Sequence, residues 1–417
     1  MKVLFLASNF PPEVNAFANR AYEHSLEWVN SGADVTVVTC APNFPQGRVR
    51  EGYKNNIHHT ETVDGIEVVR VWTFIAPNTG FLKRVLVQLS YMPGAFIAGL
   101  FQKTDVILAS SPNFFSGVIA YALSRLKRRP WVFEIRDIFP ESIVAVGAMK
   151  KSPVIRALEK LELFLYRTAD RVIVVTPAFK HNIARRGIDA DKIDVVPNGV
   201  NRARFQTLEK DRALLDALSL DGKLVIGYLG THGMAHGLDF IVRCAAKITA
   251  DRLHFLFIGD GAEKPSVVAL AASLGLKNVT FLDPVGRDSV ARYLSLFDIA
   301  LVPLRRLDTF KEVIPSKIFE AGAMGKPILL GVEGQAKEII EEYDAGLCFE
   351  PENEASFLAA LDRFANEPAL VAQLKAGCER LAHSYDRKVL AARALAILGS
   401  VVGNGAEAPS NVSRGLS

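Results

Sequence analysis

The sequence predicts an α/β protein built from two Rossmann-like, doubly wound parallel-sheet domains in series. Short apolar runs typical of buried strands alternate with amphipathic helical stretches along nearly the whole chain. This rhythm stops in the charged segment 201–222 and restarts at Leu224. A length of 417 residues is also too great for one compact core.

The first half is expected to form a domain over residues 1–200. Its predicted strands are the apolar runs at 3–7, 35–39, 67–71, 106–109, 131–135, 172–176 and 193–196. Helical periodicity lies between them at 17–30, 114–126 and 155–168. The polar segment 41–63, which contains Pro, Gly, Asn and His, is expected to be a loop.

The second half is expected to form a domain over residues 201–384, with 201–222 as a linker. Its predicted strands lie at 224–229, 255–258, 279–282, 299–303, 327–330 and 346–349. In such sheets ligands bind beyond the carboxyl ends of the strands, so the expected site is the cleft between the domains. Residues 403–417 are rich in Gly, Ala, Ser and Asn and are expected to be disordered.

Composition excludes several classes of protein. The chain is 49% hydrophobic and 23% charged, as in ordinary globular proteins, which excludes a disordered or low-complexity chain. Its net charge of +4 is too small to indicate nucleic-acid binding. The excess lies in residues 1–200, which hold 24 basic and 18 acidic groups. This bias fits either a solvated basic face or an anionic surface such as a membrane.

The expected location is cytoplasmic. The four cysteines are scattered without CxxC spacing, as in reduced proteins, and the apolar start is shorter than a signal peptide. Segment 85–101 is apolar and flanked by cations but interrupted by Gln88, Pro93 and Gly94. It is interpreted first as a core or interdomain helix and second as a peripheral contact with the inner face of the membrane.

The strongest functional signal is the segment 310–327, between two predicted strands. Ser316 is a natural N-cap, so a helix should begin there with Lys317 beside its N-terminus, where an anion is favoured. Glu320 follows one turn later and could accept the hydroxyls of a ribose, and Glu312 could reach a sugar beyond the phosphates. This pattern indicates a nucleotide-sugar site; the alternative is a solvated helix face with paired charges.

Glu312 and Glu320, with seven residues between them, resemble the EX7E motif of retaining glycosyltransferases with the GT-B fold, specifically family 4. Other segments match this family in order: 10–13, 21–24 and 32–37, then 196–200, 227–237, 258–261 and 298–303. The sequences of residues 136–142 and 315–320 are similar to those in a branch of the family that transfers fucosamine and other N-acetylated amino sugars in O-antigen and capsule synthesis.

The resemblance implies a nucleotide-sugar donor, with UDP as the expected nucleotide, and a glycan or polyprenyl-lipid-linked acceptor. It implies no metal and no cofactor, because the nucleotide sugar is a substrate. It also implies that a C-terminal helix, at about 385–400, crosses back to the first domain.

The chain departs from the family at the donor diphosphate. Many relatives carry an Arg after the position of Gly230 and a Lys before that of Gly237, where this chain has Thr231 and His236. Losing two cations there would be costly unless others replace them.

Candidate replacements are Lys317 and Arg305 or Arg306. Backbone N–H groups of the loop 230–237, including Gly233, could also bind phosphate. His232 and His236 could donate hydrogen bonds when protonated; the alternative for His232 is an exposed, uninvolved side chain.

Acceptor-side candidates lie in the first half. Glu13, Asn15 and Glu141 follow predicted strands, although Glu13 could instead serve the start of the next helix. Arg136 and Asp137 could act on the acceptor or stabilise charge, or simply form a salt bridge at the strand end.

Other readings remain. Asp189 and Asp191 have the DxD form of a metal site in a different fold but lie in a predicted surface loop, which favours simple surface polarity. A nucleotide-sugar epimerase of the same fold would need no acceptor. A catalytically silent accessory subunit of a transferase would fit the cations missing at Thr231 and His236.

Overall fold

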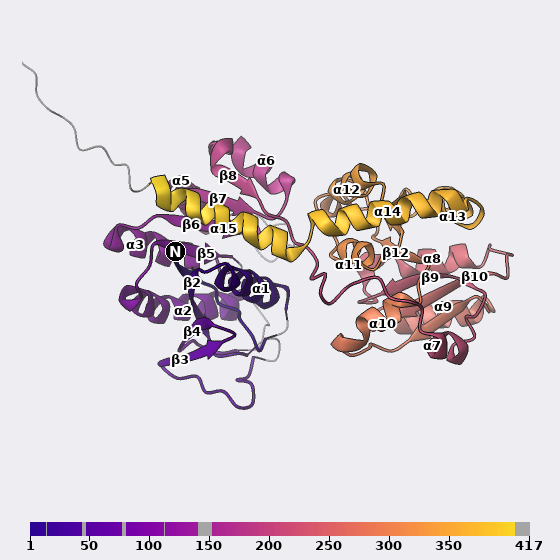
Figure 1. The fold of residues 1–417 in the computed structure, drawn as a ribbon, viewed down its shortest axis with the longest axis horizontal. Helices are drawn as coiled ribbons and strands as arrows, with labels where there is room; N and C mark the ends of the chain where they lie inside the picture. The colour runs from indigo at the N-terminus through magenta and orange to yellow at the C-terminus, as the bar shows by residue number, and fades with distance from the viewer. Residues whose placement is uncertain (14, 44–46, 77–80, 112, 141–151, 405–417) are drawn as a thin grey trace, which may run out of the picture. The chain divides into compact units, whose positions relative to one another are not determined.

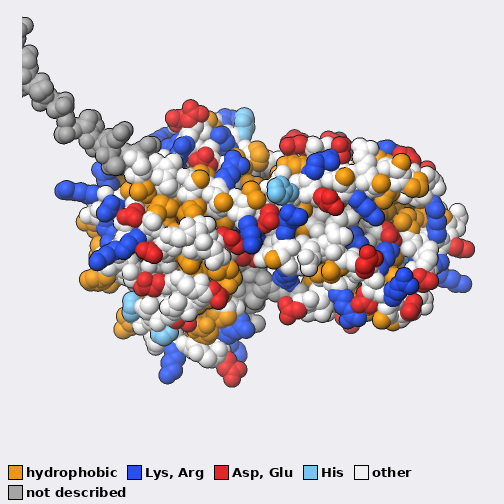
Figure 2. Space-filling view, viewed as in Figure 1, with side chains coloured by type: hydrophobic (Ala, Val, Ile, Leu, Met, Phe, Trp, Pro, Cys, Tyr) orange, Lys and Arg blue, Asp and Glu red, His pale blue; other side chains and the backbone are white. Residues whose placement is uncertain are grey.

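The computed structural model describes residues 1–404 except 14, 44–46, 77–80, 112 and 141–151. The chain forms two compact units (Figure 1). The first consists of Met1–Asn198 with the residues from Lys388 onward, and the second is Gly199–Arg387. On the face shown in Figure 2, side chains of both charges are interspersed over each unit.

The first unit is built on an eight-stranded sheet in the order β3-β4-β2-β1-β5-β6-β7-β8. Every pair is parallel except β3 with β4. The strands are β1 (Lys2–Leu6), β2 (Asp34–Cys40), β3 (His58–Val63), β4 (Ile66–Val71), β5 (Val106–Ser110), β6 (Trp131–Ile135), β7 (Arg171–Val174) and β8 (Ile193–Val195). Their helices are α1 (Ala16–Asn30), α2 (Phe81–Phe101), α3 (Ser116–Lys127), α5 (Pro153–Thr168), α6 (Pro177–Arg185) and α15 (Arg387–Asn404).

The second unit contains a six-stranded parallel sheet in the order β11-β10-β9-β12-β13-β14. The strands are β9 (Leu224–Leu229), β10 (Leu253–Ile258), β11 (Val279–Leu282), β12 (Ile299–Pro303), β13 (Ile328–Gly331) and β14 (Gly346–Cys348). The helices are α7 (Arg212–Ala217), α8 (Leu238–Ala245), α9 (Lys264–Ser273), α10 (Val290–Ser295), α11 (Lys317–Ala323), α12 (Gln335–Tyr343), α13 (Glu354–Asn366) and α14 (Pro368–Ser384). Single 3-10 turns are η1 (Ala190–Lys192), η2 (Met234–His236), η3 (Arg287–Ser289) and η4 (Asp308–Phe310).

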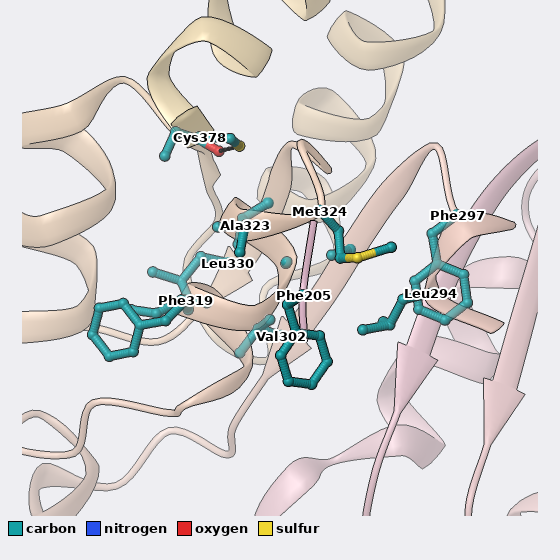
Figure 3. Packing of buried hydrophobic residues seen from close by; sticks show 14 of the residues in the cluster. Phe205, Leu294, Phe297, Val302, Phe319, Ala323, Met324, Leu330 and Cys378 are labelled. Atoms are coloured by element: carbon teal, nitrogen blue, oxygen red, sulfur yellow. Dashed lines mark hydrogen bonds between the residues drawn. The ribbon is translucent and has the colours of Figure 1, made fainter. Parts of the chain in front are cut away.

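Both sheets are buried on two faces, which explains why their strands are continuous apolar runs. In the second unit, the buried cluster on one face of the sheet joins Phe319 of α11 with Phe205, Phe297 and Met324, the residue that caps this helix (Figure 3). Gly227 on β9 makes this packing possible, since a Cβ there would lie 2.0 Å from the Phe297 ring. The core therefore fixes the position of α11 against the sheet.

The fold class predicted from the sequence is confirmed, but two segments differ. The segment 41–63 is not all loop, because β3 pairs antiparallel with β4 through the turn at Asp64 and Gly65. The linker 201–222 contains α7, whose N-cap Asp211 accepts a hydrogen bond from the Leu214 N–H. Helix α15 also extends through Asn404, two residues into the predicted tail; the rest of the tail lies outside the described residues.

Helix α15 completes the core of the first unit. Its Leu390, Ala391, Ala394 and Leu398 are buried with Trp28, whose indole N–H donates to the Ala391 carbonyl at 2.8 Å. Two segments that are distant in sequence pair where this helix begins. The Val200 N–H donates to Tyr385 O, and the Arg387 N–H donates to Val200 O.

The segment 85–101 lies within α2 and has two sides. Tyr91, Ala95 and Ala98 are buried in the core, as its first interpretation requires. Ile97 and Phe101 are exposed, by 56% and 82%. No helix in the described part of the chain combines the length and apolar character that crossing a membrane requires.

Candidate functional site

In the second unit, the loops after β9 and β10 meet backbone to backbone. The Gly230 N–H donates to Ile258 O at 2.9 Å, and the His232 N–H donates to Asp260 O at 2.8 Å. A Cβ on Gly259 would lie 1.9 Å from Gly230 O, so this approach requires glycine. The loop that was predicted to bind phosphate is therefore held firmly at the carboxyl edge of the sheet.

Lys317, the first residue of α11, points its ammonium at this loop. Its Nζ lies 3.8 Å from the centroid of the Tyr228 ring and is buried. It has no hydrogen-bond partner among the described residues. Burial lowers the pKa of Lys317 to about 7, and only Glu320 opposes that shift. A buried cation without an acceptor is a ready partner for an anion.

The two glutamates of the motif differ in environment. Glu320 is half-buried on α11, and burial raises its pKa against the opposing charges of Arg387, Lys317 and Arg204. Glu312 is exposed in the loop before the helix. Ser316 occupies the N-cap position, but its helical dihedral angles leave its hydroxyl without the predicted capping hydrogen bond.

The structure corrects the predictions for the two histidines. His232 is fully buried among Tyr228, Phe257 and Phe281, so its exposed alternative is wrong. Burial and neighbouring lysines lower the pKa of His232 to about 4, and burial and Lys317 do the same for His236. Neither ring is therefore charged near neutral pH, and neither replaces a missing cation. Thr231 is exposed in the same loop.

Arg305 is occupied by other partners. Its guanidinium contacts Asp239 at 2.8 Å and Glu352 at 2.9 Å, and its Nε donates to Met234 O at 2.7 Å. Arg305 thus fixes the end of the 230–237 loop, and its charge is already neutralised. Arg306 is likewise paired with Glu350, at 2.7 Å. Of the proposed replacement cations, Lys317 alone has a side chain that forms no ion pair or hydrogen bond with a described residue.

Gly230→Ala is expected to lower nucleotide affinity more than stability. A Cβ at Gly230 would lie 2.6 Å from the Lys317 Nζ, at a φ of +145° that favours glycine, and would push the flexible ammonium aside. Gly233→Ala is the matched control, because its Cβ would meet nothing closer than 3.5 Å. Calorimetric titration with UDP, together with thermal unfolding, compares the two variants; equal affinities would contradict this placement of Lys317.

In the first unit, two of the acceptor-side candidates have structural partners. Glu13 is buried, and its carboxylate accepts hydrogen bonds from the Asn9 side chain and the Asn43 N–H, both at 2.8 Å. Asn15 is the N-cap of α1 and accepts from the N–H groups of Phe17 and Ala18. These residues shape the loops beyond β1 and β2, and the carboxylate of Glu13 joins one loop to the other.

Arg136 and Asp137 follow β6 at the same edge of the sheet. The Arg136 N–H donates to the Ser111 hydroxyl, and the guanidinium lies 4.7 Å from the centroid of the Phe17 ring. Asp137 is exposed. Glu141 lies outside the described residues.

The sequence reasoning missed Arg20. Its Nε contacts Glu134 at 2.8 Å, and its other nitrogens donate to the carbonyls of Val196 and Pro197. Burial raises the pKa of Glu134, but Arg20, Arg136 and His24 outweigh it and hold that pKa at about 2. A carboxylate within the apolar strand 131–135 was a signal for a buried cationic partner.

The residues the structure describes contain no cluster of three or more His, Cys, Asp or Glu that could hold a metal. Asp189 instead accepts a hydrogen bond from the Asp191 N–H, at 3.0 Å, at the start of η1.

Comparisons with known proteins identify the class. Residues 17–199 match the glycosyl transferase 4-like domain, and residues 223–367 match glycosyl transferases group 1. These matches cover most of the chain, so the protein belongs to the glycosyltransferases, and its two parallel-sheet units have the GT-B fold.

Individual proteins that resemble this chain are only distantly similar to it in sequence. A protein of Escherichia coli (strain K12), named as a colanic acid biosynthesis glycosyl transferase, WcaI, is 26% identical over 87% of this chain and 91% of its own. The sucrose-phosphate synthase of Thermosynechococcus elongatus is similar in fold, with a TM-score of 0.71 and 17% sequence identity. The match covers 97% of this chain and 99% of the synthase. HepE of Anabaena, solved in complex with UDP, is also similar in fold, with a TM-score of 0.69 and 18% sequence identity. The match covers 96% of this chain and 100% of HepE.

Proposed function

We propose that this glycosyltransferase transfers a sugar from a UDP-linked donor, with retention of anomeric configuration, in the synthesis of a surface polysaccharide. The observation that carries the proposal is the buried ammonium of Lys317, which faces the loop at Gly230 and has no hydrogen-bond partner in the part of the chain that the structure describes. The UDP of HepE and the colanic acid pathway in the name of WcaI support the nucleotide and the product class. The motif resemblance supports retention and an N-acetylated amino sugar as the group transferred.

In the proposed reaction, Lys317 neutralises charge that develops on the departing diphosphate, and backbone N–H groups near Gly230 share it. Glu320 accepts hydrogen bonds from the ribose hydroxyls. Glu312 lies near the donor sugar and favours positive charge at its anomeric carbon. The acceptor, a glycan or a polyprenyl-linked glycan, binds the loops of the first unit that hold Glu13, Asn15, Arg136 and Asp137.

A lipid-linked acceptor would place the enzyme at the inner face of the cytoplasmic membrane. The exposed apolar residues Ile97, Leu100 and Phe101 of α2, followed by Lys103, support a peripheral contact there. This part of the proposal is independent of the donor site.

The test of the donor site is calorimetric titration with UDP, GDP and ADP. We expect UDP to bind and Glu320→Ala to weaken binding by about 1.5–3 kcal/mol, the scale for lost charged hydrogen bonds. Glu338→Ala, an exposed change on α12, should have no effect. Absence of nucleotide binding at millimolar concentration would favour the accessory subunit, and isomerisation of the donor without an acceptor would favour the epimerase.

Proton uptake is a second expected result. The pKa of Lys317 is about 7 in the empty site, and a bound diphosphate should raise it. UDP binding at about pH 8 should therefore take up a fraction of a proton, seen as a dependence of the binding heat on the ionisation enthalpy of the buffer. The uptake should vanish in Lys317→Met; uptake that persists there would assign the proton to another group.

A further inference from the structure

A basic groove lies in the first unit, away from the loops discussed above. Its volume is about 970 Å³, and three loops form most of it: residues 128–130, 167–170 and 189–192. Figure 2 shows Lys and Arg side chains gathered over the end of this unit where Figure 1 places α3.

The groove is at the opposite edge of the sheet from the acceptor-side loops. Its three loops lead directly into Trp131, Arg171 and Ile193, the first residues of β6, β7 and β8. These strands are parallel, so the loops share the amino edge of the sheet. Arg136, in contrast, follows the carboxyl end of β6. The groove is therefore not an extension of the acceptor-side loops.

Four of the arginines that line the groove have no internal role for their charge. Arg125, Arg128, Arg129 and Arg167 are exposed, and no hydrogen bond or ion pair joins their guanidinium groups to a described residue. Arg128 caps α3 with a φ of +53°, a left-handed conformation in which glycine is favoured. An arginine here is thus better explained by its side chain than by its backbone.

Two further cations shape the groove. Arg171 contacts the Asp191 carbonyl and lies 3.7 Å from Asp194, and Lys192 donates to Arg167 O at 2.6 Å. Acidic groups line it too: Asp170 accepts from the Trp131 N–H at 2.8 Å, and Asp191 is exposed. The lining is therefore mostly polar and offers cations together with acceptors for hydroxyl groups.

We propose that this groove binds an acidic oligosaccharide. Guanidinium groups bind carboxylates or phosphates through paired hydrogen bonds, and aspartates accept hydrogen bonds from sugar hydroxyls. The volume is at the upper end of the range for small-molecule sites, enough for several sugar units. This site would hold a charged glycan chain away from the reacting sugar, and it does not depend on how Lys317 binds a nucleotide.

The test uses a hyaluronan hexasaccharide, which carries carboxylates, and chitohexaose as its neutral counterpart. Calorimetry on the full chain should show binding of hyaluronan, weakened by added NaCl, and none of chitohexaose. The double variant Arg128→Gly with Arg167→Ser should weaken hyaluronan binding at least tenfold. Its melting temperature should not fall through the Arg128 change, because glycine suits that backbone.

The matched control is Arg156→Ser with Arg212→Ser, which removes the same charge from exposed arginines outside the groove. It should leave hyaluronan binding within about twofold of the unchanged protein. Glu320→Ala should also leave it unchanged, which separates this site from the donor site.

Four results would overturn the proposal. Hyaluronan could fail to bind at millimolar concentration. The control pair of substitutions could weaken hyaluronan binding as much as the groove pair does. Inorganic pyrophosphate could bind as tightly as hyaluronan, which would indicate a simple phosphate site. Phosphatidylglycerol vesicles could capture the protein through Arg128 and Arg167 while hyaluronan does not bind, which would make the groove a lipid headgroup site.

Discussion

Lys317→Met is expected to weaken UDP binding by between about tenfold and about a hundredfold, the scale for a lost charged hydrogen bond. Methionine keeps the length of the side chain and its packing on Tyr228 but removes the charge that faces the loop at Gly230. Calorimetric titration with UDP measures the change. Lys311→Met is the matched control, because Lys311 is exposed and already paired with Asp308.

The same substitution should stabilise the protein without nucleotide. The ammonium of Lys317 is buried without a hydrogen-bond acceptor among the described residues, which costs folding about 1–3 kcal/mol. Its folded pKa of about 7 lies below the unfolded value, so protons favour the unfolded state and the penalty fades as the pH rises above about 7. Opposite changes in affinity and melting temperature at neutral pH identify an anion site; a loss of both would mean that Lys317 is structural.

Glu134→Ala is expected to destabilise the first unit by about 3–5 kcal/mol. The carboxylate accepts hydrogen bonds from Arg20 at 2.8 Å and from the Ser110 hydroxyl at 2.5 Å, and both Arg20 and Glu134 are buried. Its removal leaves a buried guanidinium without its counter-charge. Urea-induced unfolding measures the loss, and Glu51→Ala, an exposed change in the same unit, should cost less than about 0.5 kcal/mol.

The pH dependence of this pair has a definite sign. The pKa of Glu134 falls from 4.5 to about 2 on folding, so its contribution is complete above about pH 4.5 and is lost as the pH falls towards 2. Glu134→Ala should flatten the stability curve in this window. The double variant Arg20→Leu with Glu134→Leu should recover much of the stability, because it leaves neither member of the pair as an uncompensated buried charge. Equal losses in the single and double variants would contradict the coupling.

Buried parallel strands were predictable because both of their faces are covered, so each is an uninterrupted apolar run. The edge strand β3 was missed because its side chains are mostly exposed and polar. A local signal existed: Asp64 and Gly65, both with positive φ, form the two-residue turn that joins β3 to β4. Helix α7 was hidden in the same way by its charged surroundings, although Asp211 marks its start.

The residues of the candidate site were predictable from the sequence, but their burial and their contacts were not. Lys317 follows from the motif, whereas its burial depends on Tyr228, which lies far away in sequence on β9. Arg305 was predicted to bind phosphate because it lies just past the strand 299–303. Its actual partners, Asp239 and Glu352, are distant in sequence, so no local pattern could reveal the pairing. The burial of His232 similarly depends on aromatic residues from three strands, which no local pattern reveals.

Helix α15 has a consequence for the order of events during synthesis. The ribosome makes residues 1–198 before the second unit, but Trp28 and its neighbours remain without part of their core until Leu390, Ala391 and Leu398 emerge after that unit. The second unit is continuous in sequence and can fold before that point. The first unit is therefore expected to be completed after the second, and a nascent chain stalled before α15 should expose the apolar surface of the first unit to chaperones.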